Sequence, residues 1–389
     1  MIKHYTADII FPIVGSPIEN GVVSVDQDGK ITFIGTRKEA DSLGFNEIEI
    51  VKGAIVPGFV NAHCHLELSH MLGKVTPKSG LVDFLISIMK LRASEEAVII
   101  KEASNADALM FENGIVAVGD ISNLSITSSI KEKSKIYYHT FIETLGVDPK
   151  RADVAFERAL NIQEAFKYQP RSLVPHAPYS VSQALFKLLE SYGEQHVNIY
   201  SIHNQESEQE NQLFENGEGD FLKLYEFLNT EFPAAVKFKK RPLETYLPYL
   251  SKQTTVLVHN TYISSADLNY AKETHNDLYF CLCPAANLYI EDRLPDVQML
   301  QRAGVNLVIG TDSLASNHTL NILEELLILQ QFSDVPLVDS LAWATINGAK
   351  LLNVEDRLGS IEIGKSPGLN LISVDSHRKI LNNKVRRLV

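Results

Sequence analysis

The sequence predicts an α/β protein, a (β/α)₈ TIM barrel joined to a small β domain that is built from both ends of the chain. Three observations predict this fold. Eight apolar runs follow one another from Ile55 onward, amphipathic stretches separate them, and both termini show short strands between turns instead. Repeated strand-helix units favour a parallel sheet, and eight units close into a barrel whose sites lie at the carboxyl ends of the strands.

The predicted barrel strands are apolar runs bounded by polar or turn-forming residues. They cover residues 54–63, 114–122, 135–144, 171–180, 197–205, 254–263, 278–287 and 305–313. Amphipathic spacing predicts helices over residues 79–94 and 320–332, and a final helix is expected over 340–352.

The two ends of the chain each carry too few strands to fold alone. The first fifty residues read as short antiparallel strands separated by turns, and the chain returns to β character after the final helix. We therefore expect residues 1–54 and 356–389 to form one composite β-sandwich domain. Residues 55–355 are expected to form the barrel.

The composition excludes several classes of protein. The net charge of -12 comes from 48 acidic and 36 basic residues spread along the chain, whereas a nucleic-acid-binding protein needs a concentrated basic face. Three cysteines are too few for a disulfide framework, which predicts a reducing compartment. Because no secretion signal pattern and no run of about twenty apolar residues occurs, we expect a cytoplasmic protein without a membrane span.

The first predicted strand ends on two histidines, His63 and His65, with Cys64 between them. Side chains alternate between the two faces of a strand, so both imidazoles point the same way and Cys64 points the other way. Imidazole nitrogen is a good ligand for zinc and neighbouring divalent ions. The pair therefore predicts half of a metal site, with the remaining ligands further along the chain.

Other polar groups follow the ends of later predicted strands. His176 lies in the fourth run, His203 in the fifth, His259 in the sixth and Asp312 in the eighth. One histidine at a strand end is usually a hydrogen-bonded structural residue. Since the carboxyl ends of barrel strands meet at one mouth, five such ends favour a shared site.

Six segments, in this order and spacing, resemble the amidohydrolase superfamily, in particular its deaminase and chlorohydrolase branch: PGFVNAHCHLE, HAPYS, HNQES, LVHNTYI, CPAANLYI and IGTDSLASN. The resemblance covers nearly the whole chain. It implies one divalent metal ion held by His63, His65, His203 and Asp312. Zinc is the expected ion, and the same ligands accept iron(II) or manganese. The fourth run lacks the lysine that bridges two ions in other members, and Glu143 is expected to be structural.

The resemblance also implies the catalytic roles. A divalent ion lowers the pKa of a bound water so that hydroxide attacks the substrate at neutral pH. Glu206 stands where the family keeps the glutamate that moves the proton, and Glu208 and Glu210 are expected to be solvated. His259 is expected to polarise the attacked centre, and Asp312 to accept a proton as well as bind metal. His176 matches a histidine that contacts substrate.

The resemblance does not identify the substrate, because the segment after the histidine pair differs from that of many deaminases. Glu67, Ser69 and His70 are candidate substrate contacts in the segment LELSH, which is similar to that of deaminases acting on aminofutalosine. We expect ammonia release from an aminated, purine-like heterocycle or an aminofutalosine-like compound.

Three alternatives remain open at this point. Hydrolytic dechlorination and opening of a cyclic amide, as in imidazolone hydrolysis, use the same activated water, so the core residues do not separate them from deamination. A non-catalytic binding protein would show damage in this set of residues, and no member is missing. The expected partners are a small-molecule substrate and a second copy in a homodimer, with no nucleic acid and no membrane.

Overall fold

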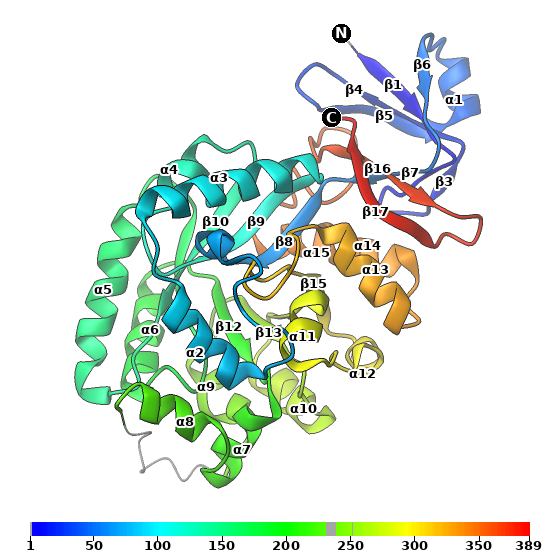
Figure 1. Cartoon of the computed structure of the whole chain (residues 1–389). Coiled ribbons are helices and arrows are strands. Elements are labelled where there is room, and N and C mark those ends of the chain that lie inside the picture. Colours follow the sequence, from blue (N-terminus) through cyan, green and yellow to red (C-terminus); the bar gives the residue numbers. More distant parts are fainter. Residues whose placement is uncertain (1, 231–238, 251) are drawn as a thin grey trace.

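The structure, a computed structural model, describes residues 2–230, 239–250 and 252–389. It confirms the mixed α/β class. Parallel sheets with surrounding helices form the larger part, and short strands from both ends of the chain lie together on one side, where both termini are found (Figure 1). No helix within the described ranges has the length and apolar character needed to cross a membrane.

The larger part contains two four-stranded sheets in which every paired strand is parallel to its neighbour. The first has the order β11-β10-β9-β8, and the second β12-β13-β14-β15. Their bounds are β8 Phe59–Cys64, β9 Ile115–Ser122, β10 Tyr137–Thr144, β11 Arg171–Pro175, β12 Tyr200–Asn204, β13 Thr255–His259, β14 Leu278–Leu282 and β15 Asn306–Ile309. Seven of the eight predicted runs contain one of these strands completely, and the run 54–63 contains β8 except for Cys64.

The two sheets approach each other at both of their edges. An isolated parallel bridge joins Cys64 to Asp312, and the backbone N–H groups of Thr311 and Asp312 donate to the His63 carbonyl at 3.0 and 3.1 Å. On the other side the His203 N–H donates to the His176 carbonyl at 2.9 Å. These contacts bring the carboxyl ends of β8, β11, β12 and β15 to one place.

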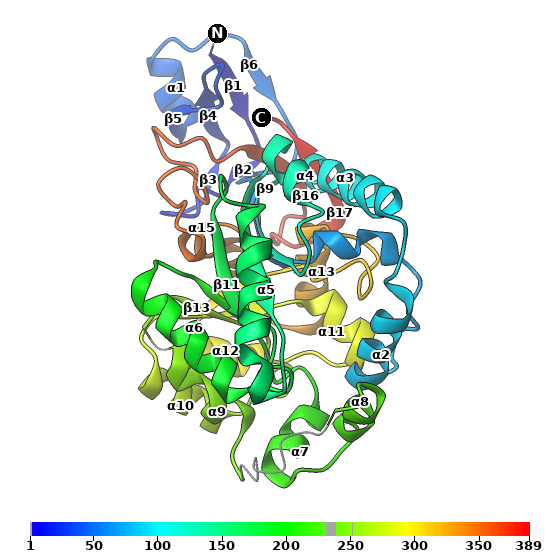
Figure 2. The same cartoon turned by 90° about the vertical axis from the view of Figure 1, so that its left-hand side faces the viewer.

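The helices cover the outer faces of the strands, which are buried on both sides. In Figure 2, α5 lies across the strands, where it packs against β10 and β11. The longer helices are α2 Leu81–Leu91, α3 Glu96–Glu112, α5 Ala152–Glu164, α6 Gln183–Gln195, α10 Ser265–Thr274 and α13 Ile322–Phe332. The shorter ones are α4 Ser128–Lys133, α7 Glu208–Asn216, α8 Phe221–Phe227, α9 Pro242–Leu250, α11 Pro284–Glu291, α12 Val297–Arg302, α14 Leu337–Trp343 and α15 Ile346–Leu351.

The strands from the two ends of the chain form two further sheets. One has the order β5-β4-β1-β6, with β1 Lys3–Thr6, β4 Gly21–Val25, β5 Ile31–Thr36 and β6 Ile48–Ile50, next to the short helix α1 Arg37–Ser42. The other has the order β17-β16-β7-β2-β3, with β2 Ile9–Ile10, β3 Ile18–Glu19, β7 Ala54–Pro57, β16 Leu369–Val374 and β17 Ile380–Arg387. The second sheet therefore pairs strands from both ends of the chain.

Three details differ from the sequence prediction. The run 54–63 is two strands, because β7 pairs with β16 and β2 and the chain changes sheet at Gly58. Only glycine fits there, since an added Cβ would lie 2.3 Å from Val116 and 2.5 Å from the Pro367 carbonyl oxygen. The predicted final helix, 340–352, is split into α14 and α15 at Thr345, and β1 pairs with β6 in parallel.

A fully buried ion pair supports the end of β8. Lys131 of α4 lies 2.6 Å from Asp120 of β9, and both side chains have no exposed surface. The other oxygen of Asp120 accepts the backbone N–H of Leu66 at 2.7 Å, directly after the second histidine of the pair. Lys131 also donates to Ser122 and Thr140. The pair thus fixes the chain where it leaves the strand.

Replacing Lys131 with methionine is expected to lower the free energy of unfolding by about 3–5 kcal/mol, because the Asp120 charge is left buried without a partner. Adding Asp120→Asn to this variant is expected to recover part of the loss, since the amide oxygen still accepts the Leu66 N–H. Urea unfolding curves measure both effects, with exposed Lys133→Met as the control. Equal midpoints for Lys131→Met and Lys133→Met would show that the pair does not contribute to stability.

Candidate metal centre and active site

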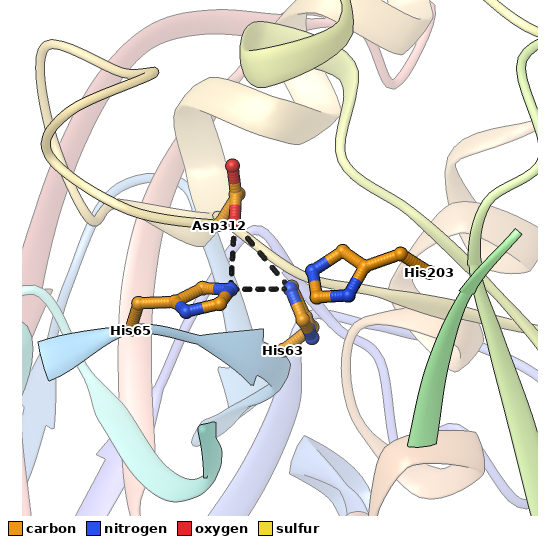
Figure 3. A group of neighbouring side chains, drawn as sticks. All are labelled: His63, His65, His203 and Asp312. Atoms are coloured by element: carbon orange, nitrogen blue, oxygen red, sulfur yellow. Dashed lines mark hydrogen bonds and ion pairs between the residues drawn. The ribbon is translucent and has the colours of Figure 1, made fainter. Parts of the chain in front are cut away.

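Four side chains from three widely separated parts of the chain meet at the carboxyl ends of the strands (Figure 3). They are His63 and His65 at the end of β8, His203 in β12 and Asp312 just after β15. One potential ligand atom from each lies within 4.8 Å of all the others. The structure therefore brings together all four residues that the sequence predicts as metal ligands.

The spacing of three of these atoms suits a small divalent ion. The His63 and His65 Nε2 atoms are 3.1 Å apart, and the Asp312 Oδ1 atom lies 3.4 Å from the first and 3.2 Å from the second. Ligands about 2.0–2.1 Å from a tetrahedral zinc ion are roughly 3.4 Å from one another. The donor set, imidazole nitrogens with one carboxylate, is also the usual one for such an ion, so these residues fit the expected metal.

Hydrogen bonds to neighbouring groups orient the ligands. The His203 Nδ1 atom donates to the His176 backbone carbonyl at 2.8 Å, which leaves Nε2 free to face the other ligands. Ser316 donates to the second carboxylate oxygen of Asp312. Asp312 has a left-handed backbone with φ 56°, held by the hydrogen bonds to the His63 carbonyl. Strain of this kind persists only where surrounding contacts fix it, as they do here.

The charges of the ligands prepare the site for a cation. Burial lowers the pKa of His65, but hydrogen bonding and charge from Asp312, together with Glu143 and Asp120, raise it to about 9. Burial alone would raise the pKa of Asp312, and its bonds to His63 and His65 hold it well below the ordinary value. In the metal-free protein a proton on His65 therefore balances the carboxylate, and a metal ion has to displace it.

Glu206 and His259 lie next to the ligands. The Glu206 Oε1 atom is 3.5 Å from His259 Nε2, and both side chains are buried. Burial and the neighbouring carboxylate of Asp312 raise the pKa of Glu206 well above its ordinary value, which favours the protonated form of this acid. Burial lowers the pKa of His259 to about 3, which keeps its imidazole neutral. Like Asp312, His259 has a left-handed backbone, with φ 73°.

Glu210 holds the backbone on both sides of the Gln205–Glu206 peptide bond. The prediction that its side chain is solvated is wrong. Its side chain is fully buried. Its two oxygens accept the backbone N–H groups of Gln205 and Glu206, at 2.9 and 3.2 Å, and these hydrogen bonds replace those lost to water. Glu208 is exposed, as predicted. In the segment ESEQE, the first and last acids therefore point inward and only the middle one faces solvent.

One cavity of about 180 Å³ opens from these residues. Its inner end is lined by His65, His203, Glu206, His259 and Asp312. Its middle contains polar groups, among them Asn123, Glu143, His176 and Ser180, and its outer wall is apolar and comes largely from α2. A ligand in this cavity would therefore meet the candidate metal ligands at one end and an apolar surface at the other.

Glu143 and His176 face each other in the middle of the cavity. The Glu143 Oε2 atom accepts from the Asn123 amide at 2.8 Å, while its buried Oε1 atom has no hydrogen-bond partner within the described residues. His176 binds Ser180 through Nδ1 at 2.6 Å. Both residues form a second group of potential ligand atoms with His203. His203 Nδ1, which lies 3.7 Å from Glu143, is already a donor to a carbonyl, so this group is no independent metal site.

The three predicted substrate contacts after the histidine pair have different positions. Glu67 lines the cavity. Ser69 donates to the Leu66 carbonyl at 2.7 Å, and His70 lies 2.9 Å from the Arg92 carbonyl through Nε2; neither residue lines the cavity. The turn that follows β8 directs these two side chains toward backbone groups, which alternation along a strand does not reveal.

Several cavity residues have no signal in the sequence analysis. Arg92, Asn123 and Ser180 carry no motif, and the apolar face of α2 reads as an ordinary core-facing helix. The sequence predicts a structural role for Glu143, and the structure places this residue in the cavity lining. The tertiary arrangement alone places these residues in the cavity.

Comparisons with known proteins bear on the family and on the fold. A model described as "Amidohydrolase family" matches residues 54–387. The adenosine deaminase of Helicobacter pylori is 26% identical over 338 residues, which cover 82% of this chain and 78% of that protein. The aminodeoxyfutalosine deaminase of a Nitratiruptor species is 25% identical over 337 residues, covering 82% and 79%. The crystal structure of Helicobacter pylori aminofutalosine deaminase superimposes with a TM-score of 0.82, at 23% identity and full coverage of both chains, which shows a shared fold.

The affinity of the purified protein for a divalent ion is expected to fall with acidity. Below pH 9 the ion has to displace the proton on His65, so the dissociation constant should rise roughly ten-fold for each unit by which the pH is lowered. Competition with a chromophoric chelator between pH 6 and pH 9 measures this dependence, after correction for the chelator's own protonation. A dissociation constant that does not change over this interval would contradict the assigned proton.

Proposed function

The chain belongs to the amidohydrolase family, and we propose that it is a metal-dependent hydrolase that acts on carbon-nitrogen bonds and deaminates an aminated, purine-like heterocycle with release of ammonia. The observation that carries this proposal is the meeting of His63, His65, His203 and Asp312, of which the last three line one cavity together with Glu206. The similar proteins support it, since they are named adenosine deaminase and aminodeoxyfutalosine deaminase.

Each residue of the inner end has a role in this chemistry. A divalent ion held by the four ligands would supply an activated water as the nucleophile. Glu206 faces the cavity, donates its proton to a ring nitrogen and recovers one proton from the attacking water. Neutral His259 lies beside Glu206 and orients the attacked carbon. Asp312, besides holding the ion, accepts the second proton of the attacking water and passes it to the departing amine, which leaves as ammonia.

The proposal has a finer part that concerns the fold and the ion. We propose that the two parallel sheets close into one (β/α)₈ barrel, supported by the contacts that join β15 to β8 and β11 to β12. The terminal strands would form a composite β-sandwich domain, with the change of sheet at Gly58. Zinc is the proposed ion because it prefers tetrahedral nitrogen and oxygen ligands. A cytoplasmic location remains a prediction from the sequence.

Dechlorination and opening of a cyclic amide remain alternatives, because both use the same activated water. Ammonia release separates them from deamination directly. Purified, metal-loaded protein is expected to release ammonia from at least one compound among adenine, guanine, adenosine-type nucleosides and aminofutalosine. Chloride release from a chlorinated triazine, or ring opening of an imidazolone, without ammonia from any of the amines would favour the alternatives.

Two substitutions separate the metal ligands from the proton carrier. Asp312→Asn is expected to weaken metal binding, since the site loses its only anionic ligand. Glu206→Gln is expected to keep the metal and to lower kcat by about 10²–10⁴-fold, because the amide cannot transfer a proton. Elemental analysis and ammonia release measure the two effects.

The matched control is Glu208→Gln, which removes an exposed acid two residues away. It should leave both metal content and turnover at the level of the unmodified protein. Near-normal turnover by the Glu206→Gln protein would show that another group moves the proton.

A further inference from the structure

The peptide group between Thr311 and Asp312 sets the position of the Asp312 carboxylate. The left-handed backbone of Asp312 is one that residues with a side chain rarely adopt, so this peptide has to be held in place. On one side its N–H group donates to the His63 carbonyl, and the preceding N–H, that of Thr311, is shared between this carbonyl and the Asn61 Oδ1 atom. In a trans peptide the carbonyl points the opposite way, so the Thr311 carbonyl needs a donor of its own.

The side-chain amide of Asn317 supplies that donor. Its buried Nδ2 atom donates to the Thr311 carbonyl at 2.9 Å and to the Glu325 Oε1 atom at 2.8 Å. Its Oδ1 atom accepts the backbone N–H groups of His318 and Thr319, at 2.7 and 3.3 Å. The opposite orientation of the amide would turn its oxygen toward two acceptors, so these contacts fix the orientation.

Glu325 of α13 is a buried acid that the deamination chemistry does not use. Its side chain has no exposed surface, and its second oxygen, Oε2, accepts the backbone N–H of Ala285 at 2.8 Å, at the start of α11. The charges that act on it most strongly are those of Glu324 and Asp312, and both are negative. A buried carboxyl group in such surroundings is costly unless its hydrogen bonds serve the structure. Glu325 joins the loop after β14 to the loop after β15, which carries Asp312.

We propose that Glu325 is a positioning residue for the metal centre. It fixes the Asn317 amide, the amide fixes the peptide before Asp312, and this peptide holds the Asp312 carboxylate beside the histidine pair. Glu325 does not line the cavity and acts only through these groups. Groups that orient a metal ligand in this way change metal affinity by roughly 10–100-fold when they are replaced. This inference rests on the proposed function, because it concerns one of the proposed metal ligands.

Metal binding by Glu325→Gln tests the inference. The substitution keeps the size of the side chain but leaves one acceptor oxygen for two N–H donors, so one donor meets an NH₂ group. The dissociation constant for zinc, measured by chelator competition at one fixed pH, is expected to rise roughly 10–100-fold. The visible absorption of the cobalt(II)-loaded protein is expected to change as well, because it reports the geometry of the ligands. Glu324→Gln, which replaces the half-buried acid next to it, should leave both measurements unchanged.

A loss of stability alone would give a different result. Leu189→Ala removes a buried side chain from the core at α6 and is expected to lower the thermal midpoint. Its folded form should bind zinc with the affinity of the unmodified protein and give the same cobalt spectrum. An unchanged dissociation constant in folded Glu325→Gln would overturn the inference and leave the proposed function intact. An unmodified protein that binds neither zinc nor cobalt would count against both.

A double substitution tests the route through Asn317. Asn317→Asp places a carboxylate opposite Glu325 and the Thr311 carbonyl, so it is expected to weaken zinc binding. When Glu325→Gln is added, the new amide donates to the new carboxylate and still accepts the Ala285 N–H. The double variant is therefore expected to bind zinc more tightly than Asn317→Asp alone. If the losses of the two single variants simply multiply in the double variant, the residues act independently and the inference is refuted.

Discussion

The approach of the two parallel sheets at the end of β8 is the constraint on which the site depends. The backbone of Thr311 and Asp312 donates to the His63 carbonyl, so the carboxylate from one sheet is fixed against the histidine pair of the other. Nearly 250 residues of chain separate these groups. Without this junction the three ligand atoms that now lie 3.1–3.4 Å apart would have no common position.

The inner end of the cavity could be predicted from the sequence because its residues occupy strand ends. Strand alternation places His63 and His65 on one face, and parallel strands bring His203 and Asp312 to the same edge. The resemblance supplied Glu206 and His259. The outer end could not be predicted, since Arg92 and the apolar face of α2 depend on how a helix after a loop packs over the mouth. The local sequence does not determine how that helix packs.

The parts of the sequence prediction that are wrong have the same cause. The run 54–63 is continuous in hydrophobicity, and nothing in its pattern marks the change of partner strands at Gly58. The inward position of Glu210 likewise follows from the backbone N–H groups that it binds, in a segment whose acidic composition suggests a solvated surface. The first feature depends on contacts between residues distant in the sequence, and the second depends on the course of one turn.

The single residue between β7 and β8 has a consequence for how such proteins are recombined. β7 is held by a strand from the far end of the chain, and β8 carries the first two ligands, so Gly58 leaves no linker between them. An exchange of terminal domains between related proteins would therefore displace the histidine pair unless the crossover kept both strands and β16 from the same parent. The two ends of the gene and the start of the active site have to be inherited together.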